Sequence, residues 1–530
     1  MAANPDTLSR FAPLTDIVGA EHVLTEPDEL EYYSQDVYRA FETALAVVRP
    51  GSVDELAGVV RAARRAGLAI VPRGGGMSYT DGYLHSTDRG ITLDLSRLDR
   101  IVEIDPDDMI VTVEVGCTWE RLNAALAEHN LRTPYWGPLS GLRATVGGAL
   151  SQNSVFWGAA AAGSAAEAVI GMDVITGTGE VLPTGAHGAS RGRPFFRWDG
   201  PDLTGLFIGD TGALGIKARA TLRLVPRPAV TRGMSFSFES MPGVCAAMSA
   251  MAREGITSEC YAFDPGLQNQ RVLGGDSDLA EDVKTLGRVA REKGIGESLK
   301  VAAAGRRFAK QFDWGLHVHV EDRTAAAAEH LEQRVLAIAV KHGGRTMPNS
   351  LPTILTAQPF PPPNSMLGPQ GERWVPIHGK VAHSQVVTTM NAVDALFADH
   401  AADIERLQIR TGYLLCLVGH TSMLIEPVFF WPDAAAAMHH RNVEAAVLEK
   451  LPVHAANPEA AALVETLRDA IRAIFLAQGA VHFQLGKYYP YREGRQPAAW
   501  QALVELKALF DPDGILNPGQ LGLNAPDPEV

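Results

Sequence analysis

Cysteine is scarce in this sequence, and its scarcity argues against two kinds of protein. The 530 residues contain four cysteines, Cys117, Cys245, Cys260 and Cys416, and no two of them form a CxxC pair. Such widely spaced thiols argue against a disulfide framework and against a thiolate metal site, and they are typical of a reducing compartment. We therefore expect a cytoplasmic protein.

An excess of positive charge is also missing. Lysine and arginine together number 47 against 61 acidic residues, which gives a net charge of −14. Nucleic acids and anionic membranes bind to basic patches, so we expect neither as a partner. No run of 18 apolar residues occurs, and the first residues lack the basic and apolar regions of a signal peptide. With 46% hydrophobic residues, the chain is expected to be globular, with roughly two to four domains.

Glycine, by contrast, is concentrated in a few short stretches. The first is Pro72-Arg73-Gly74-Gly75-Gly76-Met77-Ser78, which follows a helix pattern from Ser52 and a short strand ending at Val71. A turn without Cβ atoms can adopt positive φ, which we expect at Gly75, and can bring backbone N–H groups close to a phosphate. With Arg73 nearby, such a loop would hold a dinucleotide pyrophosphate. A tight, flexible turn would give the same short pattern, so the motif alone does not decide.

Two further stretches of small residues follow in the chain. They are Ala144-Thr145-Val146-Gly147-Gly148 and Gly212-Ala213-Leu214-Gly215-Ile216, and the second leads into a strand ending at Val225-Pro226. A closing segment, Phe510-Asp511-Pro512-Asp513-Gly514-Ile515-Leu516-Asn517-Pro518-Gly519, lies near the end. In order and spacing, these motifs resemble the flavin-binding domain of the vanillyl-alcohol oxidase / p-cresol methylhydroxylase superfamily. The resemblance covers residues 40–228 and returns at 510–519, and it implies FAD held extended between two α+β lobes.

The resemblance also implies a domain plan. We expect an α+β fold, with a two-lobed FAD-binding domain at residues 1–228, including an N-terminal lead-in. Residues 229–480 are expected to form an α+β cap or substrate domain of four or five strands in an antiparallel sheet. Residues 481–530 would return to the FAD-binding domain.

Contacts with FAD are expected mainly through the backbone of residues that lack bulky side chains. In the first stretch these are Pro72, Arg73, Gly74, Gly75, Gly76, Met77, Ser78 and the nearby Gly82. In the second they are Pro138, Leu139, Ser140, Thr145, Gly147, Gly148, Ser151, Asn153 and Gly158. In the third they are Asp210, Gly212, Ala213, Gly215 and Ile216.

The residues at the two main covalent attachment points of this superfamily cannot form a bond to flavin here. Met77 stands where one route uses a histidine, and Gly371 lies near the place of the second anchor. We therefore expect FAD to be bound non-covalently.

Histidines of the cap are the candidate catalytic groups, because their pKa is easily tuned near neutral pH. Strands around Pro376–Val381 and Leu417–His420 resemble the vanillyl-alcohol oxidase branch, which makes His378 and His420 candidates to face the flavin, with His482 nearby. Each could equally be a buried structural histidine. In that branch a Tyr-Arg pair binds the phenolate.

Here Phe483-Gln484 occupy the place of that pair, and Tyr491-Arg492 appear only later; they are the candidates for orienting substrate. His317 and His319 are two apart on a predicted strand and share a face. Without a recognisable third ligand, we predict no metal site.

The predicted function is oxidation of a small para-substituted phenol or aryl alcohol by hydride transfer to flavin N5. The alternative is a D-2-hydroxy-acid dehydrogenase of the lactate or glycolate type, and a third reading is a redox-inactive ligand-binding protein with the same fold. Oxygen, a quinone or an electron-acceptor protein would take the electrons, and a homo-oligomer is left open.

Overall fold

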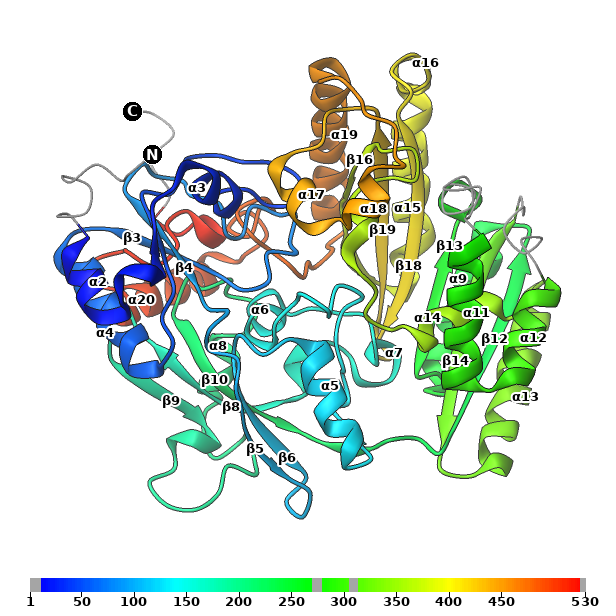
Figure 1. Ribbon diagram of the computed structural model, residues 1–530. Coiled ribbons are helices and arrows are strands. Elements are labelled where there is room, and N and C mark those ends of the chain that lie inside the picture. The colour runs from blue at the N-terminus through cyan, green and yellow to red at the C-terminus, as the bar shows by residue number, and fades with distance from the viewer. Residues whose placement is uncertain (1–10, 269–278, 305–312, 525–530) are drawn as a thin grey trace. The chain divides into compact units, whose positions relative to one another are not determined.

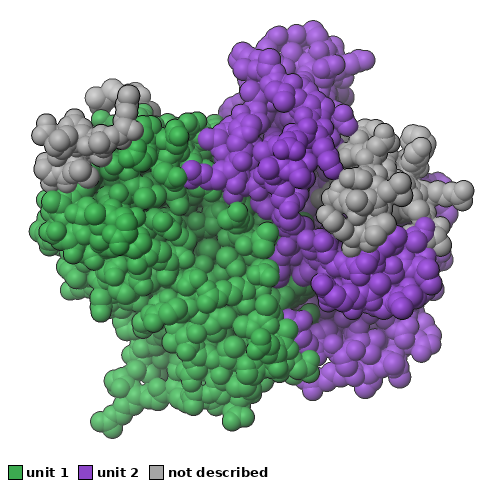
Figure 2. Space-filling model, viewed as in Figure 1, with its two compact units in different colours: residues 1–154, 165–226, 483–530 green, residues 155–164, 227–482 purple. Residues whose placement is uncertain are grey.

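The computed structural model describes residues 11–268, 279–304 and 313–524 (Figure 1). The chain divides into two compact units (Figure 2). Unit 1 comprises Met1–Ser154, Ala165–Pro226 and Phe483–Val530, and unit 2 comprises Val155–Ser164 and Arg227–His482. Residues 155–164, which are expected from the sequence to belong to the FAD-binding domain, group with unit 2. In the described ranges, no helix has the length and apolarity needed to cross a membrane.

The first sheet of unit 1 is built around a β-α-β unit. Its strand order is β1-β2-β4-β3, with β2, β4 and β3 parallel and β1 antiparallel to β2. The predicted helix after Ser52 is present as α4, and the Ser52 side chain accepts a hydrogen bond from the Glu55 N–H as its N-cap. The elements are β1 (Val23–Leu24), β2 (Val47–Val48), α4 (Val53–Arg65), β3 (Ala69–Arg73) and β4 (Gly90–Asp94), preceded by α2 (Ala12–Val18) and α3 (Pro27–Tyr33).

The second sheet of unit 1 is antiparallel, in the order β5-β6-β10-β8-β9. Its strands are β5 (Ile101–Asp105), β6 (Ile110–Glu114), β8 (Val169–Ile175), β9 (Val181–Gly185) and β10 (Ile216–Arg223). Also in unit 1 are α5 (Trp119–Glu128), β7 (Leu131–Arg132), α6 (Val146–Gln152), α8 (Leu203–Leu206), β11 (Val225–Pro226) and α20 (Pro497–Phe510). Two sheets with helices confirm the predicted two-lobed α+β architecture.

Unit 2 carries an eight-stranded antiparallel sheet in the order β15-β12-β14-β13-β18-β19-β16, with β17 also pairing with β19. The sequence predicts an antiparallel sheet of only four or five strands. One reason for the difference is that the run 374–381 forms two strands, which break at Ile377-His378. The strands are β12 (Val230–Phe238), β13 (Glu259–Phe263), β14 (Trp314–Asp322), β15 (Arg345–Met347), β16 (Arg373–Pro376), β17 (Gly379–Ala382), β18 (Arg410–Val418) and β19 (Ser422–Trp431).

Helices pack on this sheet within unit 2. Figure 1 shows α9 and α13 alongside β12 and β14, and α15 and α19 alongside β19. The helices of unit 2 are α7 (Ala159–Ala162), α9 (Met241–Glu254), α11 (Leu279–Lys293), α12 (Ile295–Ala304), α13 (Ala325–Lys341), α14 (Ser350–Ala357), α15 (Val386–Asp399), α16 (Ala401–Arg406), α17 (Ala437–Asn442), α18 (Ala445–Leu448) and α19 (Pro458–Ala477).

Candidate functional site

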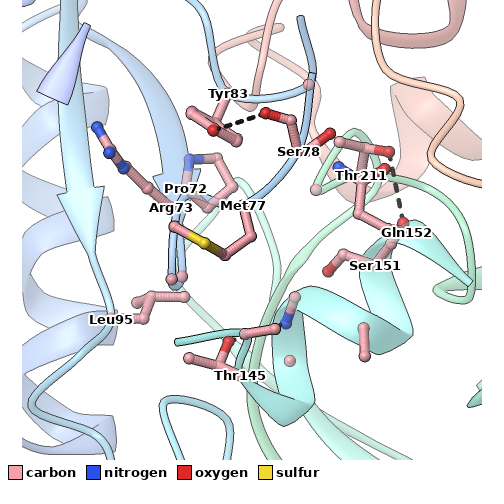
Figure 3. A pocket seen from close by; sticks show the side chains of 18 of the residues that line it. Pro72, Arg73, Met77, Ser78, Tyr83, Leu95, Thr145, Ser151, Gln152 and Thr211 are labelled. Atoms are coloured by element: carbon pink, nitrogen blue, oxygen red, sulfur yellow. Dashed lines mark hydrogen bonds between the residues drawn. The ribbon is translucent and has the colours of Figure 1, made fainter. Parts of the chain in front are cut away.

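A cavity in unit 1 collects all three glycine-rich stretches. Its wall includes residues 72–78, which form the end of β3 and the loop after it, and the start and body of α6. Thr211, Gly212 and residues 215–217, at the start of β10, complete it. Figure 3 shows Pro72, Met77 and Ser78 opposite Thr145 and Ser151. The cavity therefore lies where loops from the two sheets of unit 1 meet.

The glycine loop presents a row of unused hydrogen-bond donors to this cavity. Within the described part of the chain, none of the backbone N–H groups of residues 74–78 donates a hydrogen bond. Backbone donors are almost always paired, so consecutive unpaired N–H groups in a cavity wall indicate a site for an anion. The first turn of α6 offers no such donors, because Val146, Gly147 and Gly148 donate to Cys117 O, Val115 O and Thr145 Oγ1.

Each of the three glycines is required, by close neighbours or by its backbone conformation. A Cβ on Gly75 would lie 1.9 Å from the carbonyl oxygen of Arg143, and one on Gly74 would lie 2.5 Å from Thr145 Oγ1. The expectation of positive φ at Gly75 is wrong, because the left-handed φ of 68° belongs to Gly76. Only glycine can therefore occupy these positions, for steric reasons at Gly74 and Gly75 and for conformational ones at Gly76.

Arg73 lines the cavity, but its guanidinium is held by other residues. Nη1 donates to the Tyr32 carbonyl at 2.9 Å, and the guanidinium carbon lies 4.6, 4.8 and 5.1 Å from the ring centroids of Tyr32, Tyr33 and Tyr83. In Figure 3 the side chain points away from Met77 and Ser78. Arg73 therefore contributes its positive field and its backbone, while the loop's N–H groups supply the direct contacts.

The third stretch is shaped by a buried ion pair. Asp210 accepts hydrogen bonds from the Gly212 and Leu214 N–H groups and from Lys217 Nζ, the last at 2.6 Å. Both charged side chains are 2% exposed. Asp210 thus acts on the cavity indirectly, by fixing the turn that brings Thr211 and Gly212 into the wall.

The closing segment ties the first and third stretches together. Asn517 Nδ2 donates to Gly82 O and to Thr211 O, each at 2.8 Å, and its Oδ1 accepts from Lys487 Nζ at 2.6 Å. Lys507, on α20, donates to Ala213 O at 2.7 Å and is paired with Asp511. Burial lowers the pKa of Lys487 to about 7. The resemblance of this segment to a closing signature therefore has a structural basis, since it clamps the cavity walls.

Most of the expected cofactor contacts line the cavity. Leu139, Asn153, Gly158, Asp210 and Ala213 lie outside its lining, and Gly158 belongs to unit 2. The lining also contains residues that were not among the named contacts. Some lie inside the predicted stretches, namely Ala144, Ala149, Gln152 and Thr211, and others outside them, namely Tyr83, Leu95, Val115, Ser154, Lys217 and Gln484. Most of these sit one or two positions from the predicted motifs, whereas Gln484 is brought in from a distant part of the chain.

The candidate catalytic residues are divided between the units. His378, His420 and His482 belong to unit 2, and Tyr491 and Arg492 belong to unit 1 outside the cavity lining. Arg492 packs over the Trp500 ring at 5.6 Å. The roles of all five remain predictions.

Among the unit 2 histidines, hydrogen bonds assign the ring protons. His482 Nδ1 lies 2.7 Å from His378 O, and His420 Nδ1 lies 3.0 Å from Ala252 O. A carbonyl only accepts, so Nδ1 is protonated in each ring and Nε2 is the nitrogen that can accept a proton.

His317 and His319 share one face of β14, as predicted, and each is engaged separately. His317 Nδ1 lies 2.9 Å from Ser235 Oγ, and burial lowers the pKa of His319 to about 4. The described residues contain no group of three or more His, Cys, Asp or Glu side chains placed to hold a metal ion.

Comparison with known proteins agrees with the geometry. Residues 44–185 match the FAD binding domain family, and residues 486–521 match the C-terminal domain of FAD linked oxidases. The D-2-hydroxyglutarate dehydrogenase of Xanthomonas citri pv. viticola is 31% identical over 51% of this chain and 56% of its own. The mitochondrial D-lactate dehydrogenase [cytochrome] 1 of Saccharomyces cerevisiae is 30% identical over 40% of this chain and 35% of its own. The chain therefore spans at most about half the length of these relatives.

The fold is shared over the full length with a solved structure. p-Cresol methylhydroxylase with substrate bound aligns with a TM-score of 0.74 at 16% identity, covering 99% of this chain and 98% of that one.

The residues present fit FAD. The unpaired N–H groups of residues 74–78 would hold the pyrophosphate, and the flat wall of small residues leaves room for the rings.

We predict that Gly75→Val abolishes FAD retention, because the new Cβ would overlap the Arg143 carbonyl oxygen and displace the loop. The measurement is FAD per chain after gel filtration, from the flavin absorbance. The matched control is Gly287→Val, since nothing lies within 4 Å of a Cβ placed on Gly287. A Gly75→Val protein that keeps one FAD per chain contradicts this placement.

Proposed function

We propose that this chain, which belongs to the vanillyl-alcohol oxidase / p-cresol methylhydroxylase superfamily of flavoproteins, is an FAD-dependent oxidoreductase acting on a CH–OH or benzylic CH group. The observation that carries the proposal is the row of unpaired N–H donors at residues 74–78, in a cavity of glycine backbone. Bound FAD would supply the hydride acceptor. The third alternative, a redox-inactive ligand-binding protein, is less favoured because such a protein would have no need of a site that fits FAD.

Two features favour a D-2-hydroxy acid over a phenol as substrate, which reverses the order suggested by the motifs alone. The relatives named above are dehydrogenases of D-2-hydroxyglutarate and D-lactate. In addition, Phe483 and Gln484 stand where the phenolate-binding pair would be, and neither carries a charge for an anion. A para-substituted phenol or aryl alcohol remains the second candidate, supported by the fold shared with p-cresol methylhydroxylase.

A cluster of basic side chains in unit 2 supports an anionic substrate. Burial lowers the pKa of His378 well below its usual value, and the positive charges of Lys380 and Arg468 lower it further. Burial also lowers the pKa of Lys380 to about 8, so this ammonium is still mostly charged at pH 7. The Lys380 ammonium would attract a carboxylate, while the neutral imidazole of His378 could take the proton of the substrate's hydroxyl.

We expect anaerobic mixing of the holoenzyme with D-lactate, D-2-hydroxyglutarate or glycolate to bleach the flavin absorbance. Para-substituted phenols and aryl alcohols form the second arm of the same panel. Bleaching only by that arm would reverse the substrate order, and a yellow protein that no member reduces would favour the ligand-binding reading.

FAD is expected to leave the protein on acid precipitation, because Met77 and Gly371 offer no nucleophile at the two attachment points. All yellow colour should then appear in the supernatant. A pellet that stays yellow and fluoresces on a denaturing gel would show a covalent bond.

The proton acceptor is proposed to be His378 or His420. His378→Ala or His420→Ala should slow anaerobic flavin reduction at least about tenfold with FAD still bound, the low end of what a lost acid/base group costs. Because the pKa of His378 is lowered, its ring stays neutral as the pH falls, so wild-type reduction should not slow between pH 7 and pH 6. His330→Ala, at an exposed position of α13, is the control. Wild-type rates in both cap variants would place the base elsewhere.

A further inference from the structure

Gln152 and Gln484 both line the cavity, at the C-terminal end of α6. Thr145 caps the start of the helix beside Gly74, and Gln152 is its last residue. At a rise of 1.5 Å per residue, these ends are about 10 Å apart. The Gln152 end therefore meets a part of the ligand other than the phosphate nearest Gly74.

Gln484 is held beside Gln152 in a costly backbone conformation. Its φ of 50° lies in the left-handed region, which side chains other than asparagine and aspartate rarely adopt. Its N–H donates to Gln152 O at 2.7 Å, and its Oε1 accepts from Ser78 Oγ at 3.2 Å. Within the described residues, its amide nitrogen has no hydrogen-bond partner, so both N–H donors are available to a ligand.

Gln152 offers the complementary group. Its Oε1 is buried and accepts no hydrogen bond from any residue that the structure describes. Leaving a buried carbonyl oxygen without a hydrogen bond is unfavourable. A donor on a bound molecule would remove this cost. A phosphate cannot supply one, because its oxygens are acceptors at neutral pH.

We propose that Gln152 and Gln484 together bind the imide edge of the flavin ring, with Gln152 Oε1 accepting from its N3–H and the Gln484 amide donating to an adjacent carbonyl. The assignment rests on the proposed FAD site. An acceptor next to two donors matches the alternating carbonyl and N–H groups of that edge. The wall near these glutamines is polar, with Ser78, Ser151 and Thr211, whereas Leu95, Val115 and Ile216 offer the apolar wall that suits adenine.

The test measures FAD affinity and flavin electronics separately from turnover. Gln152→Leu and Gln484→Leu should each raise the dissociation constant of FAD about three- to tenfold, the range for one lost hydrogen bond. Gln484→Leu should also make the reduction potential of bound FAD more negative, because a donor to the ring stabilises the charge of reduced flavin. Gln408→Leu is the matched control, since Gln408 also has a left-handed φ, of 55°, and is exposed.

A modified cofactor separates a direct contact from a structural role. Wild-type protein should bind N3-methyl-FAD more weakly than FAD, and Gln152→Leu should bind the two equally. Gln484→Glu keeps the side chain's shape and the oxygen that Ser78 bonds, so a lower potential in this variant, with an unchanged melting temperature, excludes misfolding as the cause.

Four outcomes would overturn the assignment. Equal binding of FAD and N3-methyl-FAD by the wild type removes the contact to N3–H. Selective weakening by the 1,N6-etheno-adenine form of FAD, relieved in the glutamine variants, places adenine there instead. If the wild type binds no FAD at all, the proposed function fails together with the assignment, whereas tight FAD binding with unchanged potentials rejects the assignment alone.

Discussion

The approach of the glycine loop to the backbone of residues 143–145 is the constraint on which the rest of unit 1 depends. A Cβ at position 75 would come within 1.9 Å of the Arg143 oxygen, so the loop has no room for any side chain there. This close contact fixes the position of the loop. In that position the N–H groups of residues 74–78 donate no hydrogen bond to any residue that the structure describes. Those unpaired donors, and not a lysine or arginine head group, make the cavity a site for a dinucleotide.

Backbone strain gathers around the same cavity. Asn153, Thr211, Gln484 and Asn517 all have left-handed φ values, between 40° and 50°. Asparagine adopts this region comparatively readily, whereas for threonine and glutamine it is unfavourable and persists where surrounding contacts impose it. Here the contacts come from the helix end, the Asp210 turn and the closing segment. These constrained residues suit a site that must hold a reactive ring in one position.

Features that depend on residues close together in the chain could be predicted from the sequence, whereas contacts between distant residues could not. The β-α-β unit, the helix capped by Ser52 and the glycine loop follow from periodicity and turn residues a few positions apart. The steric role of Gly75 could not be predicted, because its neighbour Arg143 is distant in the chain. The same holds for Gln484, which was noted only as standing in the place of the phenolate-binding pair and not as a neighbour of the glycine loop. It holds too for the extra strands of the unit 2 sheet, whose short runs become strands only through pairing. Gly158 was expected near the cofactor but groups with unit 2, since a small-residue pattern does not reveal which unit a loop joins.

The clamp formed by the closing segment has a consequence for biosynthesis. Asn517 bridges residues 82 and 211, and the backbone of residues 515–517 hydrogen-bonds to Ile70 of β3. A chain emerging from a ribosome thus makes the glycine loop early but must complete all of unit 2 before the segment that locks the loop exists. The pocket that binds the cofactor is therefore completed only when nearly the whole chain has been made.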